Sequence, residues 1–570
     1  MKKCLALSLL ALMAIAPLTG CAGQSSNSGG NDTKNVEPLD LGEQFNPEYY
    51  PKPEDNNVAN IVGNSGSKMR IDVAINFEGT EDAWAVVARE YERLCGGIVE
   101  VKLVTGLDTS GYTERVRNEE VNPNSDWDIV QGNLMNNPEA HCDNLKGTIL
   151  SSKNPYAGNK IWADFLEEEA YITDKSGATD FCYFLNSENL STAWFVNTAA
   201  TKKAGIENHS PKTWDGLINL LEALQQAGYK YPLGLTLSKD GISASQFSWL
   251  LRVYGDYFFR DNYIHTTKTY DLVTNTDSTF VYDPTAENIE ASASFSFSRS
   301  RCLATMLDDS FALYVGPGSD KYNDFLNQLG RLAKYIKPSA YNLSFTEVRT
   351  SFMAQADGNN GDEAPQIMLD YSGEGLAFLN SSKLKNTIDY FDYPTIESDQ
   401  VMPNTLTRDV GGNGGYLAIL NCHNKKQMNL NKDFLKFYLS PYGQSIYYKA
   451  LSEKGDAPKG LTTVKNELVV IPEAWKEFFQ TDKISFTGLA DNNSHLNYGA
   501  YKLLTSTKAD NKVVELWQGF MKPTGAISTS KFSQDILATF KSCYADLAKE
   551  YNWPSDGYSS EHFNNPTYIN

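Results

Sequence analysis

The sequence predicts an α/β protein built from two lobes, each a sheet flanked by helices. Strand-like and helical segments alternate from residue 69 onwards, in the order typical of βαβ units and a parallel sheet. The chain has 570 residues, more than one hydrophobic core usually supports, which indicates two lobes. After the N-terminus, no segment contains the roughly 18 uninterrupted apolar residues that a membrane-spanning helix needs.

The first 20 residues have the pattern of a secretory signal peptide. Lys2 and Lys3 give a positive start, and residues 5–16 form an apolar run too short to cross a bilayer. The Leu-Thr-Gly-Cys sequence ending at Cys21 resembles the lipobox of bacterial lipoproteins, in which cleavage leaves this cysteine as the lipidated first residue. An ordinary signal peptide with a chance cysteine is the alternative.

Residues 21–67 are expected to form a lipid-anchored flexible tether, or an arm that lies on the globular body. The stretch after Cys21 reads AGQSSNSGGNDTKN, the composition of a flexible linker. Residues 32–67 are rich in Asn, Pro, Gly and Glu and show little periodicity. A lipid followed by such a tether would hold the protein outside the membrane without spanning it.

The charge and the cysteines exclude several classes of partner and site. With 70 acidic and 50 basic residues the chain carries a net charge of −20, which argues against nucleic acid or anionic lipid as a partner. The cysteines other than Cys4 and Cys21 show no CxxC spacing, so no zinc or disulfide framework can be read. We expect most of them to be buried free thiols, and one or two disulfide bridges are the alternative. These cysteines are Cys95, Cys142, Cys182, Cys302, Cys422 and Cys543.

The first βαβ units place a prospective site at the ends of two strands. The predicted elements are the strand MRIDVAINF, the helix AWAVVAREYERL, the strand IVEVKLVTG, the helix YTERVRNEEV and the strand DWDIVQGN. Ligands of open α/β sheets bind beyond the carboxyl ends of the strands. This predicts that residues 76–78 and 131–136 lie at a binding site.

Later segments continue the alternation. TAWFVN reads as a strand and is followed by a short helix; Thr213 is then placed to cap a helix that starts at Trp214. Trp214 is expected to pack rather than to touch ligand. Further predicted helices are DKYNDFLNQLGRLAKYI, FTEVRTSFMAQADG and KDFLKFYLSPYGQSIYYKAL, and further predicted strands begin at QIML and at GGNGGYLAI.

The usual catalytic and metal-binding motifs are absent from the sequence. Its six histidines form no HxxxH or HExxH pair, and no GxSxG elbow or Walker-type phosphate loop occurs. DGNNGDE at 357–363 lacks EF-hand spacing and is interpreted as a surface turn. A glycosidase needs two carboxylates that face one glycosidic bond. Because the chain has 70 acidic residues, the presence of such a pair in the sequence does not distinguish a glycosidase from other proteins. We therefore expect no catalytic residue, no cofactor and no metal.

Residues 192–215 carry a resemblance to a known family. An aromatic strand ending at Asn197, a short helix reaching Ala204-Gly205-Ile206 and then the sequence Pro-Lys-Thr-Trp-Asp from Pro211 closely resemble a hallmark of family 1 extracellular solute-binding proteins. These proteins are carbohydrate receptors of ABC importers, similar in fold to maltose-binding protein. The resemblance extends from about Met69 to about Ile484, with the C-terminal helices fitting more loosely. Aromatic residues make up 12% of the chain and suit sugar rings, whose apolar faces stack on aromatic planes.

The resemblance implies a type II periplasmic-binding-protein-like fold whose lobes close on ligand about a hinge of crossing strands. By this reading lobe 1 comprises residues 69–185 and 388–455, and lobe 2 comprises residues 189–380 and 458–570. It also implies a monomeric, non-enzymatic receptor that captures an oligosaccharide and delivers it to the transmembrane subunits of an ABC permease. A lipid anchor on Cys21 would hold it on the extracellular face of the cytoplasmic membrane, as suits a Gram-positive cell.

Candidate ligand-binding residues follow from matching positions in the family. They are Asn76, Glu78, Gln131, Asn133, Asn136, Glu188, Trp249, Tyr254, Tyr371, Glu374, Asn413 and Tyr498. At one position this chain departs from the family, which commonly has Gly-x-Trp after the QIML strand where this sequence reads Tyr-Ser-Gly-Glu. Either Tyr371 replaces the family's tryptophan as the ring on which a sugar stacks, or no such ring is present and Glu374 accepts hydrogen bonds from sugar hydroxyls.

Other functions remain open at this stage. The same architecture could serve a non-sugar solute such as a peptide or a polyamine, and a cleft with many carboxylates and few stacking aromatics would favour a polyamine. A surface-anchored glycoside hydrolase would share the lipid, the tether and the aromatic residues, but would release products from a glycan. An adhesive surface lipoprotein would show no closure on small ligands.

Overall fold

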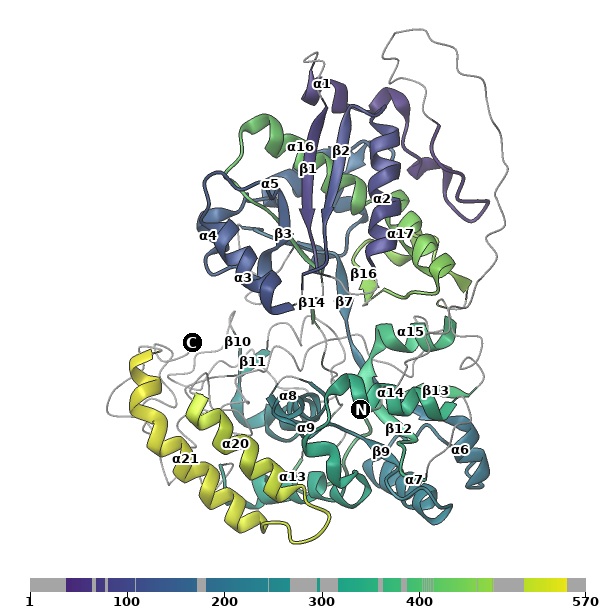
Figure 1. Ribbon diagram of the computed structural model, residues 1–570. Coiled ribbons are helices and arrows are strands. Elements are labelled where there is room, and N and C mark those ends of the chain that lie inside the picture. The colour runs from purple at the N-terminus through teal and green to yellow at the C-terminus, as the bar shows by residue number, and fades with distance from the viewer. Residues whose placement is uncertain are drawn as a thin grey trace, which may run out of the picture.

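Two lobes, one above the other in Figure 1, make up the computed structural model of this protein. The structure describes residues 37–63, 68–76, 80–107, 109–171, 181–243, 245–266, 295–297, 316–356, 362–380, 387–401, 412–413, 415–458, 460–473 and 507–550, and residues 403, 405, 407, 410 and 475 singly. In that part of the chain no helix is both long and apolar enough to cross a membrane.

Lobe 1 is built on a five-stranded sheet in the order β2-β1-β3-β15-β6. The three predicted strands are confirmed as β1 (Met69–Ala74), β2 (Val99–Val104) and β3 (Ile129–Gln131), which run parallel. The returning strand β15 (Tyr416–Ile419) lies antiparallel to both β3 and β6 (Leu185–Asn186). The carboxyl ends of β1 and β3 therefore meet at one edge of this sheet.

Helices cover both faces of the lobe 1 sheet. They are α2 (Glu81–Leu94), α3 (Thr109–Glu120), α4 (Pro138–His141), α5 (Lys146–Ser151), α16 (Lys425–Tyr438) and α17 (Pro441–Lys454). The predicted helices at 83–94 and 112–121 are confirmed as α2 and α3, and α2 buries Trp84, Val87 and Tyr91 at helical spacing. A short pair, β4 (Lys153–Asn154) and β5 (Lys160–Ile161), lies beside α5.

The prediction of one helix across residues 432–451 is wrong, because the structure has two helices there, α16 and α17. Pro441 stands at the first position of α17, where its missing N–H costs nothing. The Ser440 hydroxyl caps the same helix by accepting a hydrogen bond from the Gly443 N–H at 3.0 Å. Within a single helix Pro441 would remove a hydrogen bond and clash with the preceding turn, so the chain breaks before it.

Residues 37–63 form an arm that packs on lobe 1, one of the two readings given for the segment 21–67. Phe45, Tyr49 and Val58 are buried in the lobe 1 core, together with Val62 of the short helix α1 (Val58–Val62). The Asn56 side chain donates a hydrogen bond to the carbonyl oxygen of Leu94 at 2.9 Å. Cys21 lies outside the described residues.

Lobe 2 contains a four-stranded sheet in the order β13-β8-β12-β9. The central strand β8 (Thr192–Asn197) is antiparallel to β12 (Ile367–Tyr371) and β13 (Ile388–Phe391), while β9 (Leu233–Gly234) is parallel to β12. The predicted strands TAWFVN and QIML are thereby confirmed. A separate antiparallel pair is formed by β10 (Ile264–Thr266) and β11 (Phe295–Phe297).

Lobe 2 is rich in helices, and the last two in the chain lie at its left side in Figure 1, where they pack mainly on other helices. The helices of this lobe are α6 (Thr198–Lys203), α7 (Trp214–Gln226), α8 (Lys239–Ser243), α9 (Gln246–Tyr263), α13 (Asp320–Gly330), α14 (Phe345–Ala356), α15 (Ser372–Asn380), α20 (Thr507–Phe520) and α21 (Thr529–Glu550). The helix predicted at 320–336 ends earlier, at Gly330, and a 3-10 turn at Ala333–Tyr335 follows it. Gly330 weakens the helix at that point.

The predicted cap of α7 is confirmed and gives a first testable result. The Thr213 hydroxyl accepts a hydrogen bond from the Gly216 N–H at 3.1 Å, and Trp214 is buried with its ring 4.7 Å from that of Tyr254. Replacing Thr213 with alanine is expected to lower the free energy of unfolding by about 1 kcal/mol, measured by urea denaturation. Thr213→Ser keeps the hydroxyl and should retain most of the stability; an equal loss in both variants would contradict the cap.

One segment runs continuously from lobe 1 into lobe 2. It comprises β6, then β7 (Glu188–Leu190), then β8, with one residue between successive strands. In the middle, β7 is flanked by β14 (Gly412–Asn413) and β16 (Leu461–Thr462), so a small antiparallel sheet lies between the lobes (Figure 1). We call residues 185–197 the crossing segment.

The cysteines that the structure describes are thiols, as expected. Cys95, Cys142 and Cys182 are buried and Cys422 is partly buried, and all are free of disulfides. Burial raises the pKa of the Cys95 thiol, so this group is unreactive at neutral pH. Cys302 and the Cys543 side chain lie outside the described part of the chain.

Candidate functional site

The strand ends of both lobes meet at the crossing segment. Asn76 follows β1 and Gln131 ends β3, on the edge of lobe 1 toward which β1 points in Figure 1. In lobe 2, Tyr371 ends β12, pairs with Thr192, and is followed by Ser372, whose N–H donates to the Ser191 carbonyl at 2.9 Å. The carboxyl ends of these strands are where ligands of α/β sheets bind, so the junction is the candidate site.

On the lobe 1 side, aromatic residues lie beside Gln131. Leu417 pairs with Gln131 across β15 and β3, and the ring of the preceding residue, Tyr416, meets that of Phe184 edge to face at 5.0 Å. A Cβ on Gly132 would stand 2.9 Å from the Cβ of Phe184, so only glycine lets this ring lie so close to the strand end. Phe184 and Tyr416 are half-buried.

At the hinge, Glu188 opens β7 and is 5% exposed. Burial, and next the charge of Glu188, raises the pKa of Tyr438, Tyr447 and Tyr448. The predicted carboxylate is therefore in the crossing segment, but it lies close to the buried tyrosines of α16 and α17.

On the lobe 2 side, Tyr371 is presented on a cluster of aromatic rings. Its ring is 4.7 Å from that of Trp249 on α9 and 6.1 Å from that of Phe345 on α14. Trp249 is 2% exposed whereas Tyr371 is half-buried, so Trp249 supports Tyr371 from behind. Of Trp249 and Tyr371, which were both predicted at the site, Tyr371 is the one that can meet a ligand.

An ion-pair network lies next to this aromatic cluster. The Arg349 guanidinium donates to both oxygens of Asp370, at 2.8 and 2.7 Å, and its Nη1 lies 3.1 Å from Glu374 Oε1. It also stacks over the Phe345 ring at 4.6 Å. Asp370 is fully buried, and burial raises its pKa to about 6 against the opposing effect of Arg349. The predicted Glu374 thus lies at the site, held by Arg349.

Tyr254, also predicted at the site, instead lies in the core of lobe 2. It is 0% exposed, and its hydroxyl donates to the carbonyl oxygen of Pro394 at 2.9 Å. The reason is helix phase: five residues along α9 turn the chain by about 500°, so Tyr254 points about 140° away from Trp249. A buried side chain with its polar atom already bonded has nothing to offer a ligand in this conformation.

The structure says less about the other residues that were predicted to bind ligand. Asn136 is exposed, and its backbone N–H donates to Glu120 at 2.8 Å. Asn133, in the 3-10 turn Gly132–Leu134, and Asn413, in β14, are described only in their backbone. Glu78 and Tyr498 lie outside the described residues. Their roles stay predictions.

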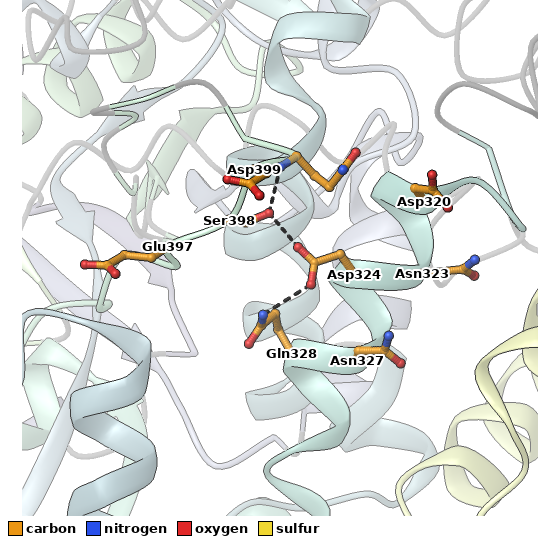
Figure 2. Close-up of a pocket in the computed structure, with 9 residues that line it drawn as sticks. Asp320, Asn323, Asp324, Asn327, Gln328, Glu397, Ser398 and Asp399 are labelled. Carbon is orange, nitrogen blue, oxygen red and sulfur yellow. Dashed lines mark hydrogen bonds between the residues drawn. The ribbon is translucent and has the colours of Figure 1, made fainter.

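Figure 2 shows an open cavity elsewhere on lobe 2, between α13 and residues 397–400. Its volume is about 440 Å³ and its lining is polar, with four carboxylates. Asp324 accepts hydrogen bonds from Ser398 at 2.5 Å and from Gln328 at 3.2 Å, so part of this polarity is used within the cavity wall. The cavity contains none of the predicted site residues. In the described part of the chain, this cavity included, no three His, Cys, Asp or Glu side chains are grouped so that they could hold a metal ion.

The sequence and the fold now define the class of protein. Residues 77–445 match the sequence model of the bacterial extracellular solute-binding protein family, and the chain belongs to that family. The predicted family is confirmed. A search among curated proteins finds no match.

Solved structures with the same fold are similar along most of the chain. One is maltose-bound MalE3 of T. maritima, with 11% identity, a TM-score of 0.50, and coverage of 83% of this chain and 99% of that one. Another is a chitin oligosaccharide binding protein, with 15% identity, a TM-score of 0.50, and coverage of 84% and 99%. These likenesses confirm the predicted two-lobed type II binding-protein fold.

Proposed function

We propose that this protein is the carbohydrate receptor of an ABC importer and binds an oligosaccharide at the junction of its lobes. The observation that carries the proposal is Tyr371, a half-buried ring that packs on Trp249 and Phe345 beside the charged groups of Arg349 and Glu374. An apolar wall with a few convergent polar groups is the surface that a sugar ring requires. The solved structures with this fold include proteins described with maltose and with chitin oligosaccharide, which supports a sugar ligand.

The receptor works without catalysis. It captures the sugar outside the cell, its lobes close about the crossing segment, and the closed form is presented to the transmembrane subunits of the permease. A lipid on Cys21 keeps it at the membrane. A polyamine receptor is less well supported, because the carboxylates of Asp370 and Glu374 are both engaged by Arg349 rather than open to an amine.

A thermal-shift screen tests the proposal. The purified protein is heated with oligosaccharides of glucose, N-acetylglucosamine, mannose and galactose, and with peptides and polyamines as the alternative ligands. A sugar present at 100 times its Kd should stabilise the protein by about 2.7 kcal/mol. A shift with peptides or amines alone would overturn the carbohydrate assignment, and appearance of shorter products would indicate a hydrolase.

Tyr371→Ala should reduce the shift produced by the sugar that binds to about half or less. Removing the ring deletes the stacking surface, and a loss of about tenfold or more in affinity is expected from the typical worth of such contacts. Tyr341→Ala is the matched control, since Tyr341 is also half-buried in lobe 2 but donates to the Met521 carbonyl instead. It should lower the melting temperature and leave the ligand shift intact; an equal loss of the shift in both variants would remove Tyr371 from the site.

A further inference from the structure

Four aromatic residues follow the lobe 1 edge of the site, and only two of them belong to the site as described above. We call Phe181, Tyr183, Phe184 and Tyr416 the aromatic strip. The first three precede β6 in the chain, and the fourth opens the neighbouring strand β15. Phe181 is 47% exposed and is one of the few large apolar side chains exposed to that extent among the described residues.

The lower end of the strip is part of the candidate site. Tyr416 pairs with Asn186 at the start of the crossing segment, and Phe184 lies against Tyr416 and Gly132. Gln131, the predicted ligand-binding residue at the end of β3, immediately precedes Gly132. The strip and the site are therefore continuous.

The upper end of the strip carries a second pair of rings. Phe181 and Tyr183 stack nearly parallel, with centroids 5.7 Å apart and planes inclined by 10°. Burial, and next the charge of Glu139, raises the pKa of Tyr183, so an exposed carboxylate of α4 lies near this pair. Phe181 is three positions before Phe184 in the chain, so their Cα atoms are at most about 11 Å apart and the two ring pairs are neighbours. A ligand that extends from Phe184 to Phe181 would contact both ring pairs.

We propose that the aromatic strip is an extension of the binding site that receives the outer sugar units of a longer oligosaccharide. This inference rests on the proposed function and adds the length of the ligand to it. Stacked rings offer flat apolar surface to the apolar faces of successive sugars. Continuity with the site selects a glycan chain over a separate protein partner.

Isothermal titration with two length series tests this inference. The probes are maltose to maltohexaose and chitobiose to chitohexaose, and the wild-type protein should bind the longer members of one series more tightly than its disaccharide. Phe181→Ala combined with Tyr183→Ala should weaken binding of the hexasaccharide about tenfold and change that of the disaccharide by no more than about twofold. Phe181→Trp, which keeps a stacking surface, should bind the hexasaccharide as the wild type does.

Leu39→Ala is the control, because Leu39 is 45% exposed on the same lobe but belongs to the arm. It should bind both sugars normally. Two results would contradict the proposed role of the aromatic strip: equal affinity of the wild type for disaccharide and hexasaccharide, or an equal loss of affinity for both sugars in the double variant. Neither result would contradict the proposed receptor function. Failure of the wild type to bind any oligosaccharide of glucose, N-acetylglucosamine, mannose or galactose would overturn both proposals.

Discussion

Replacing Arg349 with methionine is expected to lower the free energy of unfolding by about 3–5 kcal/mol at pH 7.5. The reason is that Asp370 is fully buried and both its oxygens accept hydrogen bonds from Arg349. Without the guanidinium, the fold holds an uncompensated charge in a medium of low polarity, which is among the costliest changes a protein can suffer. Urea denaturation followed by circular dichroism measures the loss.

The loss should depend on pH in a definite direction. Burial raises the pKa of Asp370 from 3.8 to about 6, so the folded protein binds this proton more tightly than the unfolded chain. A group of this kind favours folding at low pH, and its contribution is lost as pH rises from about 4 to 6. In the Arg349→Met variant the opposing positive charge is gone and the pKa rises further. At pH 5 Asp370 is then protonated, and the loss should shrink to about 1–2 kcal/mol, the worth of the missing hydrogen bonds.

A surface ion pair of similar geometry is the control. Arg331 lies 2.6 Å from Asp215, but their side chains are 37% and 67% exposed, so Arg331→Met should cost less than about 1 kcal/mol. The double variant Arg349→Met with Asp370→Asn should be more stable at pH 7.5 than Arg349→Met alone, because it removes the buried charge. Losses that are the same at pH 5 and pH 7.5 would show that Asp370 is not their source.

Replacing Gly460 with alanine is expected to destabilise the protein by about 1–3 kcal/mol and to weaken ligand binding. A Cβ on Gly460 would stand 2.1 Å from the carbonyl oxygen of Asn189 in β7, a backbone atom that cannot turn aside. Overpacking of this kind forces neighbouring strands apart. Because β7 belongs to the crossing segment, the displacement reaches the strand that joins the lobes. Thermal unfolding and sugar titration measure the two effects.

Gly147 in α5 provides the matched control for this substitution. A Cβ there would meet nothing within 4 Å, and alanine favours a helix over glycine by about 0.5–1 kcal/mol. Gly147→Ala should therefore leave stability unchanged or slightly raised, with normal ligand binding. If Gly460→Ala also binds and unfolds like the wild type, β16 can move away from β7 without affecting the hinge.

The family and the course of the chain could be predicted from the sequence because they depend on local patterns. The alternation around α2 and the cap at Thr213 each lie within a few residues, and propensity and capping act over that distance. The break before Pro441 also has a local signal, the proline itself, which the apolar pattern on both sides obscured.

The candidate site was predictable only where it follows from strand ends. Gln131 and Tyr371 lie at the junction because they end β3 and β12. The pairing of Arg349 with Asp370 joins residues that are 21 positions apart on different elements, and no spacing rule connects them. Tyr254 was wrongly expected there, since position in the chain does not give the side of the helix that faces the core.

The arm of residues 37–63 determines which lobe of the protein is connected to whatever holds its N-terminal end. Its hydrogen bonds to Leu94, to Tyr442 and to Lys160 are all made with lobe 1. Rotation of lobe 2 about the crossing segment leaves these contacts as they are. If the protein were immobilised on a sensor surface through the residues that precede the arm, lobe 1 would therefore be held in place. Lobe 2 would remain free to rotate, so a probe on lobe 2 would report ligand binding.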